Sequence, residues 1–278
     1  MQLPPASVLA SWPTPNHVHP ETRGHIGMVI GLLLGGLVTI TLAIRLYVRK
    51  WLTRGFGLDD VFIILAYFPA TTFTIIGAIA EHRLQWNRHT WDVEIKYIEP
   101  GFQLRLANDI LFDVATTLTK ISILAQLYRL TSASGDRKMT ITALISITFI
   151  SLNCFVFIMV SLFQCTPLSD FWKFSAKPPN CINQSAHLMA ANIINTITDW
   201  LVVLLPIKIA LGLNLPAKQI SMVIFLFGAG ILASSAGIAR SYYAWVMSAK
   251  DDIVWNSWPP WFCSAIELNL GIVRTDLT

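Results

Sequence analysis

The sequence predicts an all-α membrane protein, namely a bundle of seven transmembrane helices with its N-terminus outside and a short or truncated seventh helix. Composition is the first reason, since 54% of the 278 residues are hydrophobic and only 13% are charged, about half the charge of a soluble domain. Long apolar runs are the second, because about 20 helical residues cross the roughly 30 Å of hydrocarbon in a bilayer. The placement of basic residues is the third, because Lys and Arg favour the cytoplasmic side.

Six apolar runs are long, and a seventh is shorter than the roughly 17 residues that a span usually needs. In chain order we expect spans at residues 25–48, 58–80, 106–130, 139–163, 186–211, 220–247 and 258–273. Residues 1–24 have no basic segment followed by a continuous apolar core, so we interpret them as an irregular extracellular leader, not a signal peptide. Residues 25–273 form the membrane domain and residues 274–278 a short remnant.

Basic residues are concentrated in alternate connections. The first, third and fifth connections carry Arg49, Lys50, Arg54, Arg129, Arg137, Lys138, Lys208 and Lys218. The second, fourth and sixth mix their basic residues with Asp92, Glu94, Glu99, Asp170, Asp251 and Asp252. We therefore expect the odd connections in the cytoplasm and the N-terminus outside.

The predicted outer connection between the fourth and fifth spans contains Cys165 and Cys181. Cysteines on the oxidising side of a membrane can pair, and we favour a disulfide that folds this connection over the mouth of the bundle. The alternative is two free thiols. Asn183 begins a glycosylation sequon, Asn-Gln-Ser, although it lies close to the expected membrane surface.

The third predicted span is the richest in charge. Asp109, Asp113 and Lys120 follow at intervals of four and seven, which keeps them on one helix face. Charged side chains in a span face a partner or a wet cavity, so this face should point into the bundle. It forms either a polar pocket or proton path, or an internal network of salt bridges and hydrogen bonds.

The fifth predicted span repeats the pattern with Asn192, Asn195 and Asp199 on one face. Asp199 is the deepest acid in the predicted spans. Arg240 in the sixth span and Glu267 in the seventh are its expected partners.

Asp59 and Asp60 stand at the predicted cytoplasmic start of the second span. A carboxylate there can accept hydrogen bonds from free backbone N–H groups and gains from the helix dipole. Arg45 and Arg49, four residues apart, reach the same edge, so an arginine fork can hold whichever aspartate does not cap. We interpret these four residues as a clamp at the inner edge of the bundle rather than as a catalytic pair.

Ordered motifs connect these features. They read "RLYVRKW", "GLDDVFIILAY", "TKISILAQLYRL", "FQCTPLSDFW", "NIINTITDWLVVLLPIKIALGLNL" and "SAIELNLGIV". Together they resemble the rhodopsin-like domain family of fungal seven-helix membrane proteins, which includes surface-sensing receptor-like proteins and members encoded beside secondary-metabolite genes. The resemblance implies seven spans, an outer disulfide and roles for Arg45, Asp59, Asp60, Lys120, Cys165, Cys181, Asp199, Pro206 and Glu267.

The chain departs from this family at its end. Such proteins usually continue after the seventh helix with a Leu-Pro segment and a cytoplasmic tail, whereas this sequence ends at "GIVRTDLT". A truncated gene model or a short isoform would explain the departure. Any signalling that depends on the tail stays open.

The leading functional expectation is a non-enzymatic, receptor-like protein of the plasma membrane. It would sit in the lipid bilayer, bind an unknown extracellular small molecule or sense a surface cue, and contact a cytoplasmic signalling protein. We expect no retinal, since the predicted seventh span has no lysine, and no nucleic-acid partner, since no basic block or phosphate-binding loop is present.

The alternatives are an intramembrane enzyme or a transporter acting on a lipid or secondary metabolite. Acids combined with outer histidines could form a metal site, which would use His17, His19, His82, His89 and His187. No metal-binding spacing occurs among them. We therefore predict solvated histidines and no metal.

Overall fold

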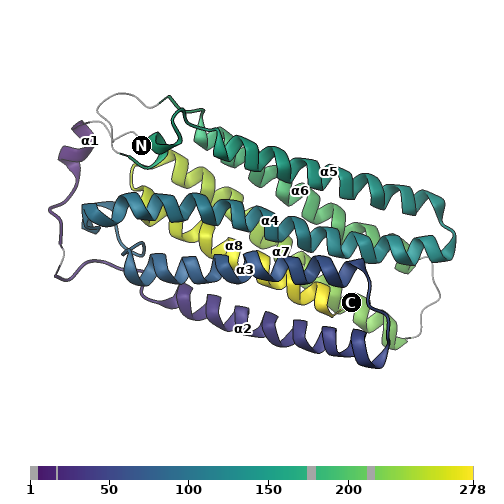
Figure 1. The fold of residues 1–278 in the computed structure, drawn as a ribbon. Coiled ribbons are helices and arrows are strands. Elements are labelled where there is room, and N and C mark those ends of the chain that lie inside the picture. Colours follow the sequence, from purple (N-terminus) through teal and green to yellow (C-terminus); the bar gives the residue numbers. More distant parts are fainter. Residues whose placement is uncertain (1–5, 17, 174–179, 212–216, 278) are drawn as a thin grey trace.

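The computed structural model describes residues 6–16, 18–173, 180–211 and 217–277, and this part of the chain is almost wholly helical (Figure 1). Seven long helices follow a short first one. They are α1 (Ala6–Ser11), α2 (Ile26–Tyr47), α3 (Leu58–Arg83), α4 (Ile95–Ser134), α5 (Arg137–Leu162), α6 (Gln184–Leu211), α7 (Ala217–Ala249) and α8 (Ile253–Asp276). A π-helical turn continues α2 over Val48–Leu52, and 3-10 turns occupy Thr90–Asp92 and Leu168–Phe171. Over the described ranges no β-strand forms, so the predicted all-α class is confirmed.

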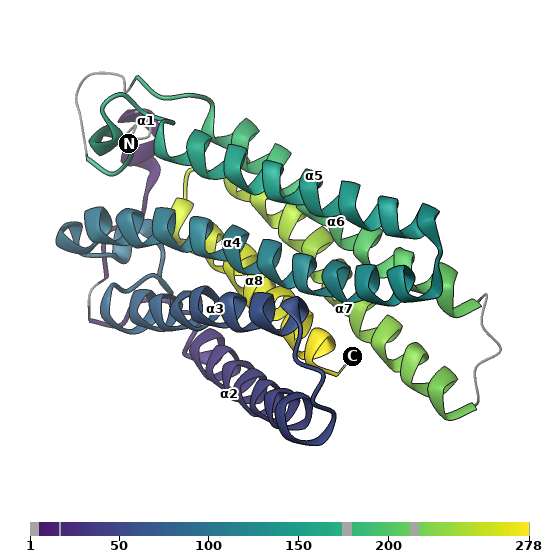
Figure 2. The same cartoon turned by 45° about the vertical axis from the view of Figure 1, so that its right-hand side comes forward.

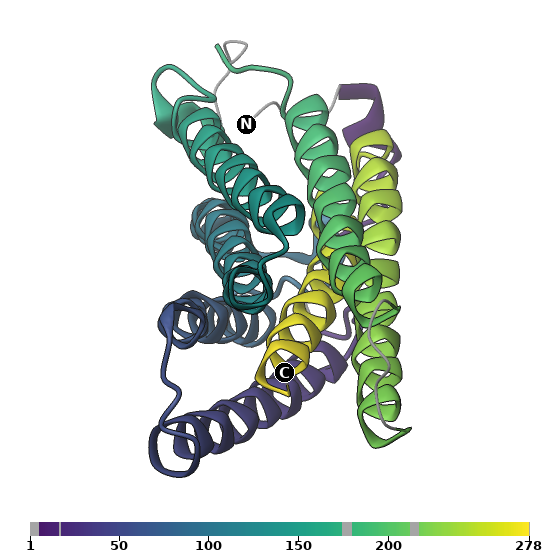
Figure 3. The same cartoon turned by 90° about the vertical axis from the view of Figure 1, so that its right-hand side faces the viewer.

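The seven long helices run side by side as a bundle, with α2 at one edge and α5 at the opposite edge (Figures 1 and 2). α4 is the central helix, because 67% of its most apolar window is buried, against 22–33% for α2, α3, α5 and α6. α8 lies between α2 and α7 (Figure 3) and also packs on α4. Groups on α4 and α8 therefore face the middle of the molecule.

The outward faces of the bundle are apolar. On α2, leucines and isoleucines such as Leu33 and Ile40 are more than half exposed, and Ile145 and Leu152 on α5 are equally so. Five helices of the described part, α2 to α6, are long and apolar enough to cross a membrane. With charged groups inside and bare apolar groups outside, this surface fits hydrocarbon rather than water. The bundle is that of a multi-pass membrane protein.

Two helices are longer than the sequence predicts. α4 begins at Ile95 rather than at residue 106, and its 40 residues include Pro100. Its extra turns pack under the connection that holds the cysteines, where Phe102 contacts Phe171. α8 begins at Ile253 rather than at residue 258 and runs for 24 residues, so the prediction of a short seventh helix is wrong. Its start is capped by Asp252, whose carboxylate accepts the Trp255 N–H.

The leader is not wholly irregular, since it contains α1. It is attached to the connection between α3 and α4. The backbone N–H of Asn16 donates to Asp92 Oδ1 at 2.8 Å, and that of Arg23 donates to the Asn87 carbonyl at 3.0 Å. The leader thus lies against the end of the bundle that also carries Cys165 and Cys181, which we call the disulfide end.

Candidate functional site

A charged network crosses the centre of the bundle between α4 and α6. Lys120 Nζ lies 3.0 Å from Asp199 Oδ1 and donates to Asn195 Oδ1 and Thr198 Oγ1, both at 2.8 Å. Lys120 is only 5% exposed. Asn195 in turn donates through Nδ2 to Asp199 Oδ2 at 3.1 Å. The Asn195 carbonyl also accepts from Lys120 Nζ, at 3.1 Å. The buried ammonium group is therefore held by a carboxylate and three neutral oxygens, as a charge in hydrocarbon requires.

The same network continues to α7 and α8. Asn195 Nδ2 donates to Glu267 Oε1 at 2.7 Å, and Arg240 Nε donates to Glu267 Oε2 at 3.2 Å. Arg240 also donates to Asn192 Oδ1 and lies over the ring of Phe112, 4.6 Å from its centroid. Four helices are thus joined by one path that runs from Lys120 through Asp199, Asn195 and Glu267 to Arg240, with the Asn195 amide between the two acids.

The pairing within this network differs from the sequence prediction. Arg240 and Glu267 are the predicted partners of Asp199, but they pair with each other, and Lys120 is the cation at Asp199. Helical spacing correctly places Asn192, Asn195 and Asp199 on one face of α6. It cannot say which neighbouring helix that face meets.

A cavity of about 130 Å³ lies on the disulfide side of this network and is lined by residues of α3, α4, α5, α6, α7 and α8. Aromatic rings line much of it. They belong to Phe73, Trp86, Phe112, Phe157, Trp258 and Trp261. Asp109 and Asp113 reach its wall, as do Arg105 and Arg240. The predicted polar face of α4 therefore borders a real cavity, although Lys120 lies beyond it.

Two carboxylate oxygens at this wall lack a hydrogen-bond partner. They are Oδ2 of Asp113, whose side chain comes from α4, and Oε1 of Glu81 from the last turn of α3. Asp113 is 9% exposed and Glu81 only 4%. Buried polar atoms are normally satisfied, so these two are candidates for contact with a ligand. Glu81 escapes sequence reasoning, because a single acid near the end of a predicted span resembles an ordinary interfacial residue.

A second, smaller cavity of about 40 Å³ lies beyond the network. Lys120, Asp199 and Glu267 line it, together with Arg274 and Ser234. The charged network therefore separates two cavities. Asn195 and Arg240 border the larger cavity, whereas Glu267, which both of them contact, borders the smaller one.

The opposite end of the bundle, which we call the clamp end, holds the paired aspartates. Arg45 Nη2 lies 2.9 Å from Asp59 Oδ2, and Arg45 Nε lies 2.9 Å from Asp60 Oδ1. All three residues are at most 4% exposed. Arg49 stands further off, at 3.7 Å from Asp59 and 3.9 Å from Asp60. One guanidinium thus binds both carboxylates.

The sequence predicts that one aspartate caps the helix and that arginine binds the other, and the structure differs from this in one respect. Asp60 does both, because its Oδ2 also accepts the Gly57 N–H at 3.0 Å. The sequence does not reveal two further members. Arg129 lies 3.8 Å from Asp59 Oδ1, and Arg45 donates to the Thr275 carbonyl at the end of α8. The clamp therefore joins α2, α3, α4 and α8.

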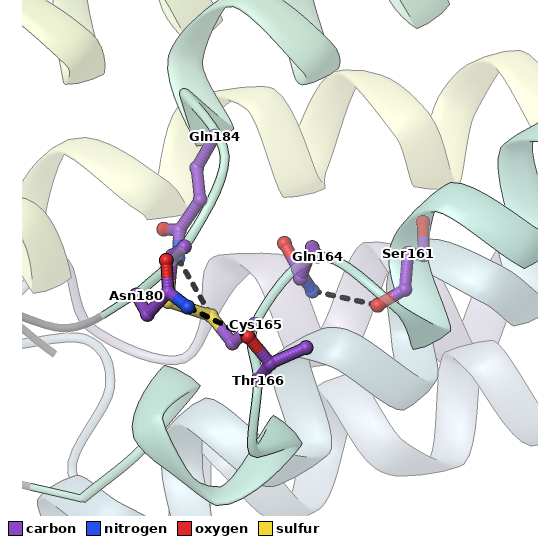
Figure 4. Close-up of a disulfide and its surroundings, with 7 residues drawn as sticks. Ser161, Gln164, Cys165, Thr166, Asn180 and Gln184 are labelled. Atoms are coloured by element: carbon purple, nitrogen blue, oxygen red, sulfur yellow. Dashed lines mark hydrogen bonds between the residues drawn. A yellow bond between two sulfur atoms is a disulfide. The ribbon is translucent and has the colours of Figure 1, made fainter.

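At the disulfide end, Cys165 and Cys181 are bonded (Figure 4), so the predicted pairing is confirmed. Backbone bonds flank it, from Ile182 N–H to Gln164 O at 2.8 Å and from Thr166 N–H to Asn180 O at 3.0 Å. The sequon residue Asn183 is exposed, and its Oδ1 accepts the Ala186 N–H at the start of α6.

Of the outer histidines, His19 and His82 are exposed, as the sequence predicts, whereas His89 and His187 are partly buried. His89 is stacked between Trp91 and Trp255, with ring centroids 4.5 Å and 4.0 Å apart, and its Nδ1 lies 2.6 Å from Asp252. Arg23 covers the other face of Trp255, 4.1 Å from its centroid, and burial lowers the pKa of this guanidinium while Asp252 opposes the shift.

The other histidines are dispersed. His187 stacks on Phe157, His25 faces His82 with ring centroids 6.0 Å apart, and His17 lies outside the described residues. Within the ranges that the structure describes, no three His, Cys, Asp or Glu side chains gather as a metal site.

Comparison with known proteins points to one family. A sequence profile of the fungal rhodopsin domain matches residues 44–277, which is most of the chain. A SAT4 family membrane protein of Emericella nidulans is 29% identical over 139 residues, covering 50% of this chain and 36% of that protein.

Two further relatives have names that refer to biosynthesis clusters. The chain is 23% identical to Fugralins biosynthesis cluster protein 2 of Gibberella zeae over 91% of its own length and 63% of the relative's. It is 25% identical to Wortmanamides biosynthesis cluster protein C of Talaromyces wortmannii over 80% of this chain and 61% of that protein. The chain thus spans about three fifths of the length of these two relatives, and less of the SAT4 family protein.

Proposed function

This chain belongs to the fungal rhodopsin domain family, and from that premise we propose that it is a receptor-like membrane protein that binds a small molecule in the aromatic cavity. In this proposal the chain crosses the plasma membrane seven times, and the disulfide end faces outward. The basic connections at the clamp end face the cytoplasm, where a signalling protein can contact them.

The cavity is the observation that carries the proposal. Small-molecule sites are mostly apolar hollows with a few well-placed polar groups, and this one combines aromatic walls with the unpaired oxygens of Glu81 and Asp113. An apolar cavity of about 150 Å³ in another protein is large enough for benzene. A volume of about 130 Å³ therefore suits a ring-sized group.

The charged network offers a route from this cavity toward the clamp end. Asn195 and Arg240 line the cavity, and both bind Glu267, which also lines the smaller cavity beyond. A ligand that favours one arrangement of these bonds over another would shift the population of helix positions. Binding in the larger cavity would then change the positions of these side chains at the smaller cavity as well.

We also expect no retinal. The family name implies no pigment, and the one lysine in the central network, Lys120, already has three polar partners. Its amine would have to leave all three to form a Schiff base.

The test uses the full chain in lipid nanodiscs and a fungal culture extract as the source of compounds. Compounds retained by the wild type are identified by mass spectrometry, and Ala244→Phe, which fills the cavity from a wall position that is 4% exposed, should retain none of them. Ala43→Phe on the outward face of α2 is the matched control and should behave as wild type.

A fluorophore at the clamp end then separates binding from signalling. It is attached to Ala133→Cys, an exposed position in the last turn of α4, with Cys154 and Cys263 replaced by Ala. Retained compounds should change its emission in the wild-type cavity and not in the Ala244→Phe background. Binding without any change in emission would reject the receptor proposal and leave a binding protein.

A second candidate is an enzyme or transporter for a secondary metabolite. The printed names of two relatives favour it, and the unpaired Asp113 oxygen at the cavity wall offers a buried general base. Conversion of a retained compound to a new mass by the wild type, lost in Asp113→Asn, would favour the enzyme. Accumulation of an unchanged compound inside sealed vesicles would favour the transporter.

A further inference from the structure

We propose that the cavity selects ligands with a protonated amine attached to a ring-sized apolar group, and that Glu81 is the counter-ion. The inference rests on the proposed ligand-binding role of the cavity and names the chemical class that it takes. Three features of the cavity carry it: an unneutralised carboxylate, its aromatic surroundings and the balance of charge on the walls.

Glu81 is buried without a full set of partners. Its Oε2 accepts a long hydrogen bond of 3.4 Å from Trp258 Nε1, and the backbone N–H of Met28 also interacts with the carboxylate. Its Oε1 has no partner at hydrogen-bond geometry. His25 Nδ1, which is positively charged only when the ring is protonated, lies 3.8 Å from Glu81 Oε1, and the His25 side chain is 59% exposed to solvent. A buried carboxylate is costly unless a proton or a cation neutralises it. A cationic ligand would supply that charge.

Among the described residues, the other two acids at the cavity wall also lack an ion pair within 4 Å, because Lys120 and Arg240 pair with Asp199 and Glu267. Positive charge nevertheless influences both acids: that of Arg105 and Arg240 on Asp109, and that of Lys120 and Arg240 on Asp113. No Lys or Arg forms an ion pair with Glu81 among the described residues. Glu81 is therefore the acid at this wall that a ligand's cation would neutralise most.

Aromatic rings surround the same carboxylate. Trp258 touches it, Trp261 packs into the space left by Gly77, and Phe73 stacks on Trp261 with centroids 6.3 Å apart. The faces of indole rings attract ammonium groups, by about 0.5–2 kcal/mol according to desolvation. Carboxylate and ring faces together recognise an amine better than either a hydroxyl or an anion.

The summed formal charge of the cavity lining is negative, which also favours a cationic ligand. Three acids, Glu81, Asp109 and Asp113, face two arginines, Arg105 and Arg240. Arg240 is also committed to Glu267. The lining is thus formally negative and would oppose an anionic ligand.

The experiment uses three probes of equal size and different charge: 2-phenylethylamine, 2-phenylethanol and phenylacetate. Each is titrated at pH 7 into the full chain in zwitterionic nanodiscs, and its affinity is taken from the rise of the thermal unfolding midpoint, since a ligand that binds only the folded state raises that midpoint. Ala244→Phe corrects for partition into the lipid. We expect the amine to bind at least about tenfold more tightly than the alcohol and the carboxylate to bind least.

Variants locate the counter-ion. Glu81→Gln should abolish the preference for the amine and leave the affinity for the alcohol within about twofold. Glu99→Gln, which neutralises an exposed acid on α4 outside the cavity lining, should keep the preference. A preference that survives in Glu81→Gln would overturn the assignment of Glu81. The wild-type ranking of the three probes needs no variant and tests the ligand class even if Glu81→Gln does not fold.

The remaining outcomes separate this inference from the proposed function. Equal binding of amine and alcohol would reject the amine class and keep the cavity as a binding site. Absence of binding by all three probes, with wild type and Ala244→Phe indistinguishable, would reject both.

Discussion

The clamp and the cavity both bury carboxylates, but the carboxylate oxygens of the clamp have polar partners, whereas the cavity leaves one oxygen of Glu81 without a hydrogen bond. At the clamp end Asp59 and Asp60 are at most 2% exposed, and each of their four oxygens lies near an arginine or a backbone N–H. At the cavity Glu81 is 4% exposed, yet one of its oxygens has no hydrogen bond. Burial therefore does not distinguish a structural acid from a binding acid. The two kinds of acid are distinguished by whether each carboxylate oxygen has a hydrogen-bond or ion-pair partner within the protein.

The largest expected effect tests whether the clamp is a closed structural unit. Arg45→Met removes the cation that lies 2.9 Å from both aspartates and leaves two carboxylates in the protein interior. Removing one partner of a buried ion pair costs about 3–5 kcal/mol. We expect a large fall in the thermal unfolding midpoint and in the yield of monodisperse protein, both measured by size-exclusion chromatography with fluorescence detection during heating.

Arg49→Met is the matched control for this substitution. Arg49 belongs to the same clamp, but its side chain is 21% exposed and its closest approach to an aspartate is 3.7 Å. More exposed ion pairs contribute roughly 0–1 kcal/mol. An equal loss of stability in both variants would show that the clamp depends on total charge rather than on the Arg45 fork.

The second prediction concerns the contribution of the disulfide to the stability of the disulfide end. Cys165 and Cys181 enclose a loop with a sequence separation of 16, and a crosslink of that size contributes about 3 kcal/mol in the loop-entropy account. The Cys165→Ser, Cys181→Ser double variant should therefore unfold at a lower temperature and lose affinity for cavity ligands. Cys263→Ser, which removes a free thiol, should do neither. Unchanged stability in the double variant would mean that leader contacts and aromatic packing suffice to hold this end.

Sequence patterns could predict which residues lie inside the bundle better than which residues meet there. Periods of three and four place Asn192, Asn195 and Asp199 on one face of α6, and the structure uses all three in the network. The same periods cannot choose Lys120 over Arg240 as the cation of Asp199. That choice depends on helix rotation and crossing, which a single helix does not encode.

The cavity itself was the least predictable feature. It forms where glycines allow large rings to approach, since a Cβ at Gly77 would overlap Trp261. It also uses Glu81, an isolated acid whose role appears only when α8 brings Trp258 beside it. The clamp, by contrast, could be predicted from neighbours in sequence, because Asp59 and Asp60 begin one helix and Arg45 ends the helix before it.

The third prediction tests whether Lys120 and Asp199 in the central network stabilise each other as an ion pair, as the clamp residues do. Lys120→Met removes the ammonium group that lies 3.0 Å from Asp199, whose side chain is 16% exposed, and should cost about 2 kcal/mol. Lys120→Met combined with Asp199→Asn removes both charges and should regain part of that loss, with a coupling of about 0.5–3 kcal/mol. Thermal unfolding of the wild type, both single variants and the double variant gives this value. Additive effects would show that the pair does not act as a unit and that the network resembles the open cavity more than the clamp.

The smallest expected effect comes from replacing a buried carboxylate by its amide, which we compare at the clamp (Asp60→Asn) and at the cavity (Glu81→Gln). Asp60→Asn replaces an oxygen that Arg45 and Gly57 use and should lower stability. Glu81→Gln removes a buried charge that lacks a cation at hydrogen-bond distance and should change stability by no more than about 1 kcal/mol, in the stabilising direction. Thermal unfolding of both variants without ligand measures the two signs side by side. A destabilising Glu81→Gln would mean that the ionised carboxylate already satisfies the folded state, through Trp258 and His25. A stabilising one would mean that the protein keeps an acid which stability alone disfavours, as expected where a side chain is retained for binding.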